Sequence, residues 1–130
     1  MTLLLDTHVW LWMLAAPERL GEARAVLEDG ERTLLLSAAS SWEIAIKHQL
    51  GRLELPQPPE RFVPDRLRLT GVTPIAIEHV HVLEAGRLPA HHRDPFDRVL
   101  VAQARHLGVP IATADPVIRS YDVTVHWVGR

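Results

Sequence analysis

Short apolar runs alternate with longer segments of helical periodicity along the whole chain, and this alternation limits the fold more than any other sequence feature. Strands that alternate with helices are typical of an α/β domain with a mostly parallel central sheet. The first run, residues 2–5, is expected to be a short buried strand. Further strands are expected at residues 33–36, 72–75, 110–113 and 123–127, and helical segments at 7–15, 19–28, 39–50, 60–69, 77–85, 94–107 and 116–120.

The size and composition of the chain fit one soluble domain. Its 130 residues are enough for a core, and we expect a single domain over residues 1–130. No apolar run approaches the roughly 20 residues that a membrane span requires, and we see no signal peptide. The chain has no cysteine, so disulfides and thiolate metal sites are excluded. A cytoplasmic protein without membrane contact is the expectation.

Four acidic residues lie where an apolar run gives way to a helical segment: Asp6, Glu43, Asp97 and Asp115. A parallel sheet gathers the carboxyl ends of its strands at one edge, so acids far apart in sequence can meet there. Two carboxylates about 4 Å apart repel by roughly 4 kcal/mol at an effective dielectric of about 20. Divalent cations make such a cluster tolerable, and oxygen ligands suit Mg²⁺ or Mn²⁺. The pattern therefore predicts a metal site built from carboxylates.

Helix capping is the alternative explanation for each acid. Ser40 to Glu43 match a capping box, Asp115 precedes a proline as an N-cap often does, and Asp6 could cap the first helix. Caps on parallel elements would converge without any metal, but convergence of acids adds repulsion that neutral caps avoid. We therefore interpret the neighbouring hydroxyls as groups that orient the carboxylates. They belong to Thr7, Ser37, Ser40 and Thr113.

Asp94 and Asp97 lie three residues apart and so share one helix face. Asp94 followed by Pro95 has the pattern of an N-cap with proline at the first helical position. We predict that Asp97 is the inward ligand and Asp94 a cap or outer partner, and the reverse assignment stays open.

Several basic residues near these acids are candidate phosphate contacts. They are Lys47, His91, His92, Arg93 and Arg98. Lys47 follows Glu43 by four residues, and a plain helix pair is slightly favoured over a phosphate contact. The His91–Arg93 stretch is equally consistent with a solvated loop. The histidines lack a zinc-binding spacing, which argues against zinc.

Two broader properties bear on nucleic-acid binding. The net charge of −2 argues against a broad basic surface, although one or two divalent ions would bring the total to 0 or +2. Trp10, Trp12 and Trp42 could stack on bases, but their helical spacing favours a core or a dimer surface.

Several segments together resemble the PIN-domain family, most closely the VapC-type toxins of bacterial toxin–antitoxin pairs. They are LLLDTHVWLW, SAASSWEIAIKHQLGRLELP, LPAHHRDPFDRVLVAQARHLGVPIATAD and the final Y-x-V strand. The likeness covers almost the whole chain, from Leu3 to Trp127, and WEIAIK and HRDPFDR are its most specific parts.

The resemblance implies a three-layer α/β/α sandwich with a central, mostly parallel sheet. It also implies a Mg²⁺- or Mn²⁺-dependent endoribonuclease that hydrolyses RNA with water, and it places the family's acids on Asp6, Glu43, Asp97 and Asp115. Thr7, Thr113 and Ser37 match the supporting hydroxyls. A homodimer inhibited by a small cognate antitoxin is the implied assembly.

Three other classes remain as alternatives. A receiver-type signalling domain has a similar size and an acidic pocket, but it needs an adjacent acid pair early in the chain and a lysine after a late strand. A haloacid-dehalogenase-like phosphatase needs D-x-D, whereas this chain has Asp6-Thr7-His8. A noncatalytic binding module of the same fold would keep the acids only as caps.

Overall fold

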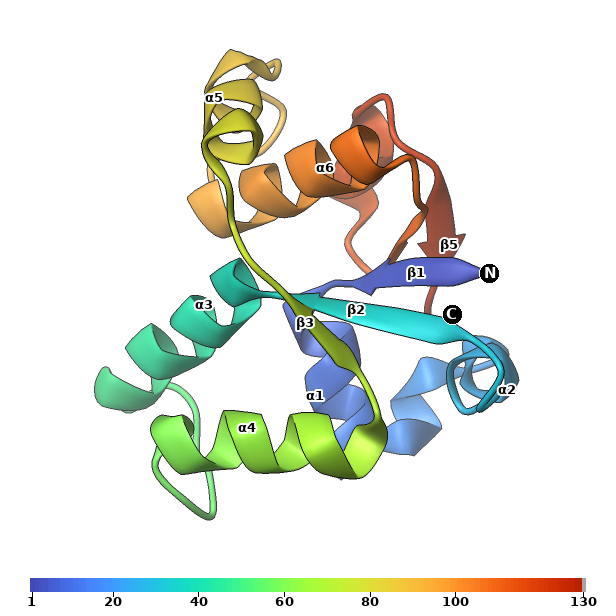
Figure 1. The fold of residues 1–130 in the computed structure, drawn as a ribbon, viewed down its shortest axis with the longest axis vertical. Coiled ribbons are helices and arrows are strands. Elements are labelled where there is room, and N and C mark those ends of the chain that lie inside the picture. Colours follow the sequence, from blue (N-terminus) through green and yellow to red (C-terminus); the bar gives the residue numbers. More distant parts are fainter. Residues whose placement is uncertain (130) are drawn as a thin grey trace.

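The computed structural model describes residues 1–129, which form a parallel sheet of five strands in the order β3-β2-β1-β4-β5 (Figure 1). The register pairs Leu3 with Leu34 and Leu4 with Ile111. The strands are β1 (Thr2–Leu5), β2 (Thr33–Ser37), β3 (Thr73–Ile75), β4 (Ile111–Thr113) and β5 (Val125–Trp127).

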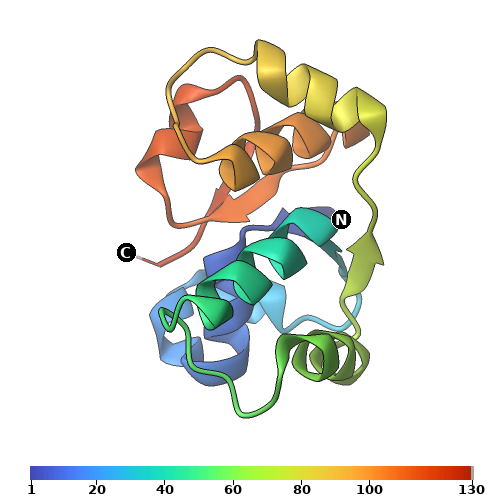
Figure 2. The same cartoon turned by 90° about the vertical axis from the view of Figure 1, so that its left-hand side faces the viewer.

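Helices cover both faces of this sheet, so the predicted α/β/α sandwich is confirmed. In Figure 1, α1, α2 and α4 lie below the sheet and α5 and α6 above it, while α3 lies beside the carboxyl ends of the strands. Figure 2 looks onto that edge, with α3 in front between the two helical layers. The helices are α1 (Thr7–Ala15), α2 (Ala23–Leu27), α3 (Ala38–Gln49), α4 (Pro59–Thr70), α5 (His79–Arg87) and α6 (Pro95–Leu107), with 3₁₀ turns η1 (Pro17–Leu20) and η2 (Pro116–Ser120).

Alternate residues of β1 enter two different cores. Leu3 and Leu5 pack with Trp10 of α1 on one side of the sheet, whereas Leu4 packs with Leu100 of α6 on the other. All of these side chains are fully buried. Because a strand exposes successive side chains to opposite faces, a run of consecutive leucines suits a strand enclosed on both sides.

One predicted helix was wrong, and the motif considered as a capping box does not cap. The segment 19–28 is not one helix, because Gly21 interrupts it with a left-handed φ of 62°. A Cβ at Gly21 would lie 3.1 Å from the Gly129 carbonyl oxygen, so the close approach of these two chain segments requires glycine. The capping box at Ser40 is also wrong, because Ser37 is the N-cap of α3 and accepts a hydrogen bond from the Ala39 amide.

The helix predicted at 94–107 is buried in its middle. Residues 100–104 of α6 are buried, and Leu100 is fully enclosed. The last turn differs, because residues 105–107 are exposed and Arg105 pairs with Glu84 of α5. The helix ends where Gly108 takes the left-handed conformation.

The strand order reverses direction between β1 and β4. From β1 the chain moves outward through β2 and β3, then returns to place β4 on the other side of β1, with β5 beyond it. In open α/β sheets, such a reversal leaves a crevice at the carboxyl ends of the two central strands, where ligands bind. Asp6 follows β1 directly, and Asp115 follows β4 after one intervening residue. Within residues 1–129, no helix has the length and apolar character to cross a membrane.

Candidate metal centre

Asp6 is a buried carboxylate at the reversal point of the sheet. Its Oδ2 accepts a 2.7 Å hydrogen bond from the Thr113 hydroxyl at the end of β4. Its side chain does not cap α1, and its Oδ1 is buried without a hydrogen-bond partner among residues 1–129. Burial raises the pKa of Asp6; the Thr113 bond and nearby His8 oppose this rise, and the charge of Glu43 adds to it. Asp6 is thus held by one oxygen, while its other oxygen has no hydrogen-bond partner among residues 1–129.

Glu43 reaches the same region from the second turn of α3 and is almost fully buried. Its Oε1 accepts a 2.8 Å bond from the Thr7 hydroxyl, which also lies 2.8 Å from Ser40 Oγ. Its Oε2 forms a 2.6 Å ion pair with Lys47, so the i,i+4 pair expected from the sequence is present. Thr7 and Ser40 therefore connect the start of α1 to α3 and orient this carboxylate.

Asp97 and Asp115 meet at a histidine. Asp97 lies in the first turn of α6 and Asp115 at the start of η2, and His92 Nε2 is 2.9 Å from the Oδ2 atom of each. The ligand atoms of these three residues lie within 4.8 Å of one another. The sequence did not indicate that His92 would stand between two of the four acids.

The pKa of Asp97 is raised by its burial and by the charges of nearby acids. Burial raises its pKa to about 8, with further contributions from the charges of Asp6, Asp94, Glu43 and Asp115, in that order. Elements far apart in the chain thus bring these carboxylates within electrostatic reach of one another. A carboxyl pKa that is raised by burial and by several like charges is typical of metal and catalytic sites, although structural clusters of charges show it too.

Capping explains part of the acid pattern. Asp94 is the N-cap of α6 and accepts a 2.9 Å bond from the Phe96 amide, so the cap predicted there is confirmed. Asp115 caps η2 through Oδ1 at 2.9 Å from the Val117 amide, while its Oδ2 stays on the His92 side. Ser37 is a helix cap, and its described hydrogen bonds include none to an acid.

The candidate phosphate contacts have different surroundings. Arg98 donates to the carbonyl oxygens of Ala85, Leu88 and Pro89 at 2.8–3.0 Å, so its guanidinium fastens the end of α5 and the loop after it. His91 and Arg93 are exposed on that loop.

The three tryptophans also differ in their surroundings. Trp10 is a core residue, and the Trp12 ring lies under the Arg19 guanidinium. Trp42 is 61% exposed and meets Phe96 edge-on.

Two residues near the acids gave no clear sequence signal. The Tyr121 hydroxyl lies 2.7 Å from the His92 amide and is its acceptor. His8 is exposed and close enough to Asp6 to influence its pKa. Adjacency to Asp6 was the only signal for His8, and Tyr121 lies 29 residues from its partner.

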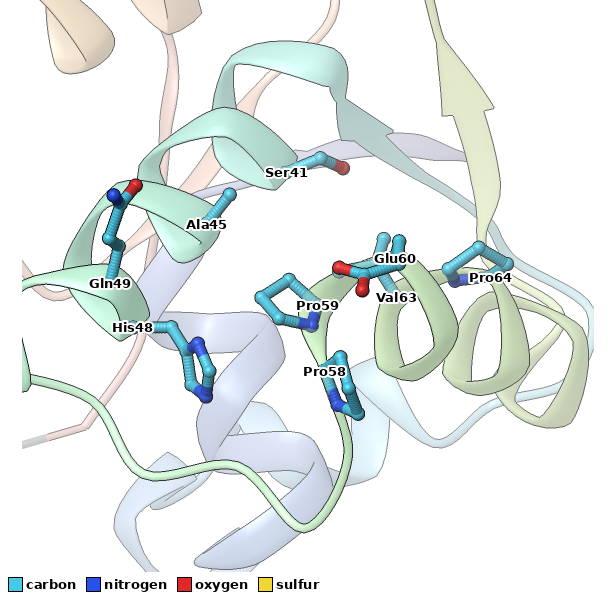
Figure 3. Close-up of a pocket in the computed structure, with 9 residues that line it drawn as sticks. All are labelled: Ser41, Ala45, His48, Gln49, Pro58, Pro59, Glu60, Val63 and Pro64. Atoms are coloured by element: carbon cyan, nitrogen blue, oxygen red, sulfur yellow. The ribbon is translucent and has the colours of Figure 1, made fainter.

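One hollow on the described surface lies away from the acids. It has a volume of about 640 Å³ and lies between α3 and the start of α4, with Ser41, His48 and Glu60 on its walls (Figure 3). None of the four acids lines it, so the carboxylate cluster is not part of this hollow.

The donor set fits a hard divalent cation. It consists of carboxylate oxygens, one of them buried and unpartnered, together with hydroxyls that orient two of the acids. Mg²⁺ and Mn²⁺ favour such oxygen ligands. Among residues 1–129, the possible ligand atoms that lie within 4.8 Å of one another belong to His92, Asp97 and Asp115, and Asp6 and Glu43 are not part of this group.

The sequence matches the PIN domain family over residues 3–123, and the chain belongs to this family. It is 46% identical over 66 residues to ribonuclease VapC16 of Mycobacterium tuberculosis, a match covering 51% of this chain and 47% of that protein. It is also 30% identical over 123 residues to ribonuclease VapC22 of the same organism, with 92% of each chain covered. The first match thus spans about half of the relative's length and the second nearly all of it.

Solved structures show the same fold. The structure of VapBC2 from Rickettsia felis bound to a promoter DNA fragment aligns with a TM-score of 0.72 at 11% identity, covering 98% of this chain and 99% of that chain. The structure of FitAB bound to an IR36 DNA fragment aligns with a TM-score of 0.65 at 18% identity, covering 98% and 94%. The family and fold inferred from the sequence motifs are therefore confirmed.

Proposed function

We propose that this chain is a single PIN domain acting as the RNA-cleaving toxin of a toxin–antitoxin pair. The reaction is metal-dependent hydrolysis of RNA phosphodiester bonds, and Asp6, Glu43, Asp97 and Asp115 form the site. RNA is chosen as the substrate because the relatives VapC16 and VapC22 are ribonucleases. The buried, unpartnered Oδ1 of Asp6 is the observation that carries the metal requirement.

The energetic argument starts from the repulsion in the pocket. The pKa of Asp97 is raised to about 8 by burial and by four other acids, so full ionisation of the cluster is unfavourable without a counter-charge. A cap needs one oxygen near one helix amide and gains nothing from burial beside other acids. The side chain of Asp6 makes no cap hydrogen bond to α1. A bound cation accounts for the cluster where capping does not.

The residues of the chain divide the work as follows. Thr113 and Thr7 hold Asp6 and Glu43 by hydroxyl donation and so fix the directions of the remaining lone pairs. The exposed side chains of His91 and Arg93 can bind phosphate beside the acids. A bound Mg²⁺ or Mn²⁺ would supply Lewis-acid activation of water and stabilisation of phosphate charge. The described site requires no side-chain nucleophile.

The direct test is incubation of the purified protein with total RNA in Mn²⁺, in Mg²⁺ and in EDTA. Cleavage is expected with the metals, none with EDTA, and none with Asp6→Asn. Asp122→Asn is the matched control, because this carboxylate is 99% exposed and pairs only with Arg105 among residues 1–129. Full activity of Asp6→Asn beside that control refutes the assignment.

The noncatalytic alternative has one observation in its favour, since Asp94 and Asp115 do cap helical segments. Calorimetric titration with Mn²⁺ separates it from the nuclease, because a protein that uses its acids only as caps would show no binding heat. Heat that disappears in Asp6→Asn supports the nuclease.

The proposed assembly is a cytoplasmic homodimer held inactive by a small cognate antitoxin. The fold is shared with the toxin–antitoxin complexes VapBC2 and FitAB, which supports a partner of this kind. Light scattering tests the dimer, and addition of the purified cognate antitoxin to the RNA assay tests the inhibition.

A further inference from the structure

His92 has the position that an ion between two carboxylates would have. Its Nε2 is 2.9 Å from Asp97 Oδ2 and 2.9 Å from Asp115 Oδ2. The side chain is 19% exposed, so the contact is largely shielded from water. Asp97 and Asp115 come from different elements, and His92 is the group that joins them.

The hydrogen bonds around the ring identify its tautomer. The Asp94 amide donates to Nδ1 at 3.2 Å, so Nδ1 carries a lone pair and the ring proton lies on Nε2. The Nε2–H group therefore donates to Asp115 Oδ2, while Asp97 Oδ2 lies 2.9 Å from the same nitrogen. Coordination of a metal through Nε2 would require the proton on Nδ1, where it would oppose the Asp94 amide.

The backbone around His92 is held independently of the acids. Its amide donates to the Tyr121 hydroxyl at 2.7 Å, and Arg98 binds the Leu88 and Pro89 carbonyl oxygens of the same loop. These contacts place the ring over the acid pair without any contribution from a cation. The fixed loop explains why a single imidazole can reach both oxygens.

We propose, on the basis of the metal-dependent function above, that His92 is a built-in substitute for the cation. In the metal-free protein its Nε2–H donates to Asp115 and the ring occupies the space between Asp115 and Asp97. When a divalent ion binds, the ring must leave these oxygens, so His92 weakens metal binding by competition. The residue positions the ligands and is displaced by the ion; it is not itself a ligand.

The first test is calorimetric titration of Mn²⁺ into the wild type and His92→Ala. Competition predicts an affinity about tenfold tighter in the variant, which corresponds to about 1.4 kcal/mol. His79→Ala is the matched control, because His79 is exposed at the start of α5 and far from the acids in sequence. Tyr121→Phe loosens the loop without changing the ring and should shift the affinity in the same direction by a smaller factor.

The second test measures the tautomer of the His92 imidazole. Imidazole ¹⁵N spectra of the metal-free protein should show the Nε2–H tautomer for His92, and saturating Mg²⁺ should change that signal while leaving His79 unaffected. A Nδ1–H tautomer, or a His92 signal indifferent to Mg²⁺, overturns the proposal.

The outcomes are distinguishable. Weaker binding by His92→Ala would make the residue a ligand, and unchanged binding would make the contact irrelevant; both results reject competition while leaving the nuclease proposal intact. Absence of Mn²⁺ heat from every variant, the wild type included, would reject the metal function and the competition together.

Discussion

The metal-free protein should become less stable as pH rises from 5 to 8, and Asp97 should be a main cause. Burial and neighbouring acids raise the pKa of this carboxyl from 3.8 to about 8. Between these values the folded protein holds a proton that the unfolded chain has released. The stabilising effect of protonated Asp97 is complete below about pH 3.8 and is lost as pH rises through about 8.

The size of the effect follows from the shift. Each unit of pKa difference is equivalent to about 1.4 kcal/mol, so the limit for the whole shift is about 6 kcal/mol. Side-chain relaxation and water entry reduce such values in real proteins. We therefore expect the free energy of unfolding to fall by about 2–4 kcal/mol between pH 5 and 8, a large part of the stability of an ordinary domain.

Urea unfolding in EDTA, measured at several pH values, provides the test. Asp97→Asn removes the titrating group, so its stability should depend much less on pH over this range and exceed that of the wild type at pH 8. Asp122→Asn is the control and should reproduce the wild-type slope, because Asp122 is exposed. Saturating Mn²⁺ should also reduce the wild-type slope, because a cation favours the ionised acids. If the free energy of unfolding in EDTA depends equally on pH in Asp97→Asn and in the wild type, the pKa of Asp97 is not raised as described.

Three further perturbations have defined outcomes. Asp6→Asn should abolish RNA cleavage yet unfold at an equal or higher urea concentration than the wild type, because a buried charge is removed. Thr113→Val removes the donor to Asp6 Oδ2 and should weaken Mn²⁺ affinity about tenfold by calorimetry, with unchanged affinity counting against the orienting role. Arg98→Ala should lower the free energy of unfolding by about 2 kcal/mol, because carbonyl groups at the end of α5 lose their donor. Arg98→Lys should not restore this stability, since an ammonium group lacks the planar array of donors of a guanidinium. Full recovery of the melting temperature in Arg98→Lys would argue against a role for the Arg98 hydrogen bonds in holding the loop.

Local sequence patterns were sufficient for most of the secondary structure. Consecutive leucines at residues 3–5 predicted a short buried strand, and the proline at the start of α6 and the glycine after its end predicted its limits. The segment 19–28 was mispredicted because Gly21 serves a contact with Gly129, which is more than a hundred residues away. Long-range constraints of this kind leave no local periodic signal.

For the acids too, local sequence patterns predicted some features and long-range contacts decided others. Their positions after strands or at helix starts, together with the parallel topology, predicted that Asp6, Glu43, Asp97 and Asp115 would approach one another, and the structure brings ligand atoms of Asp97 and Asp115 together with His92 within 4.8 Å. Which of their oxygens would be free was not predictable. Within the described part of the chain, Asp6 Oδ1 is unpaired because Thr113 donates only to Oδ2. Ser37, which was expected to orient an acid, caps α3.

The sequence by itself determined the family and the order of strands and helices along the chain, because both depend on residue types at short spacings. Only the tertiary structure decided that His92 lies between Asp97 and Asp115 and that Arg98 holds the loop instead of facing solvent. Both depend on how the loop after α5 packs against Tyr121, and such packing is set by contacts between residues distant in the chain.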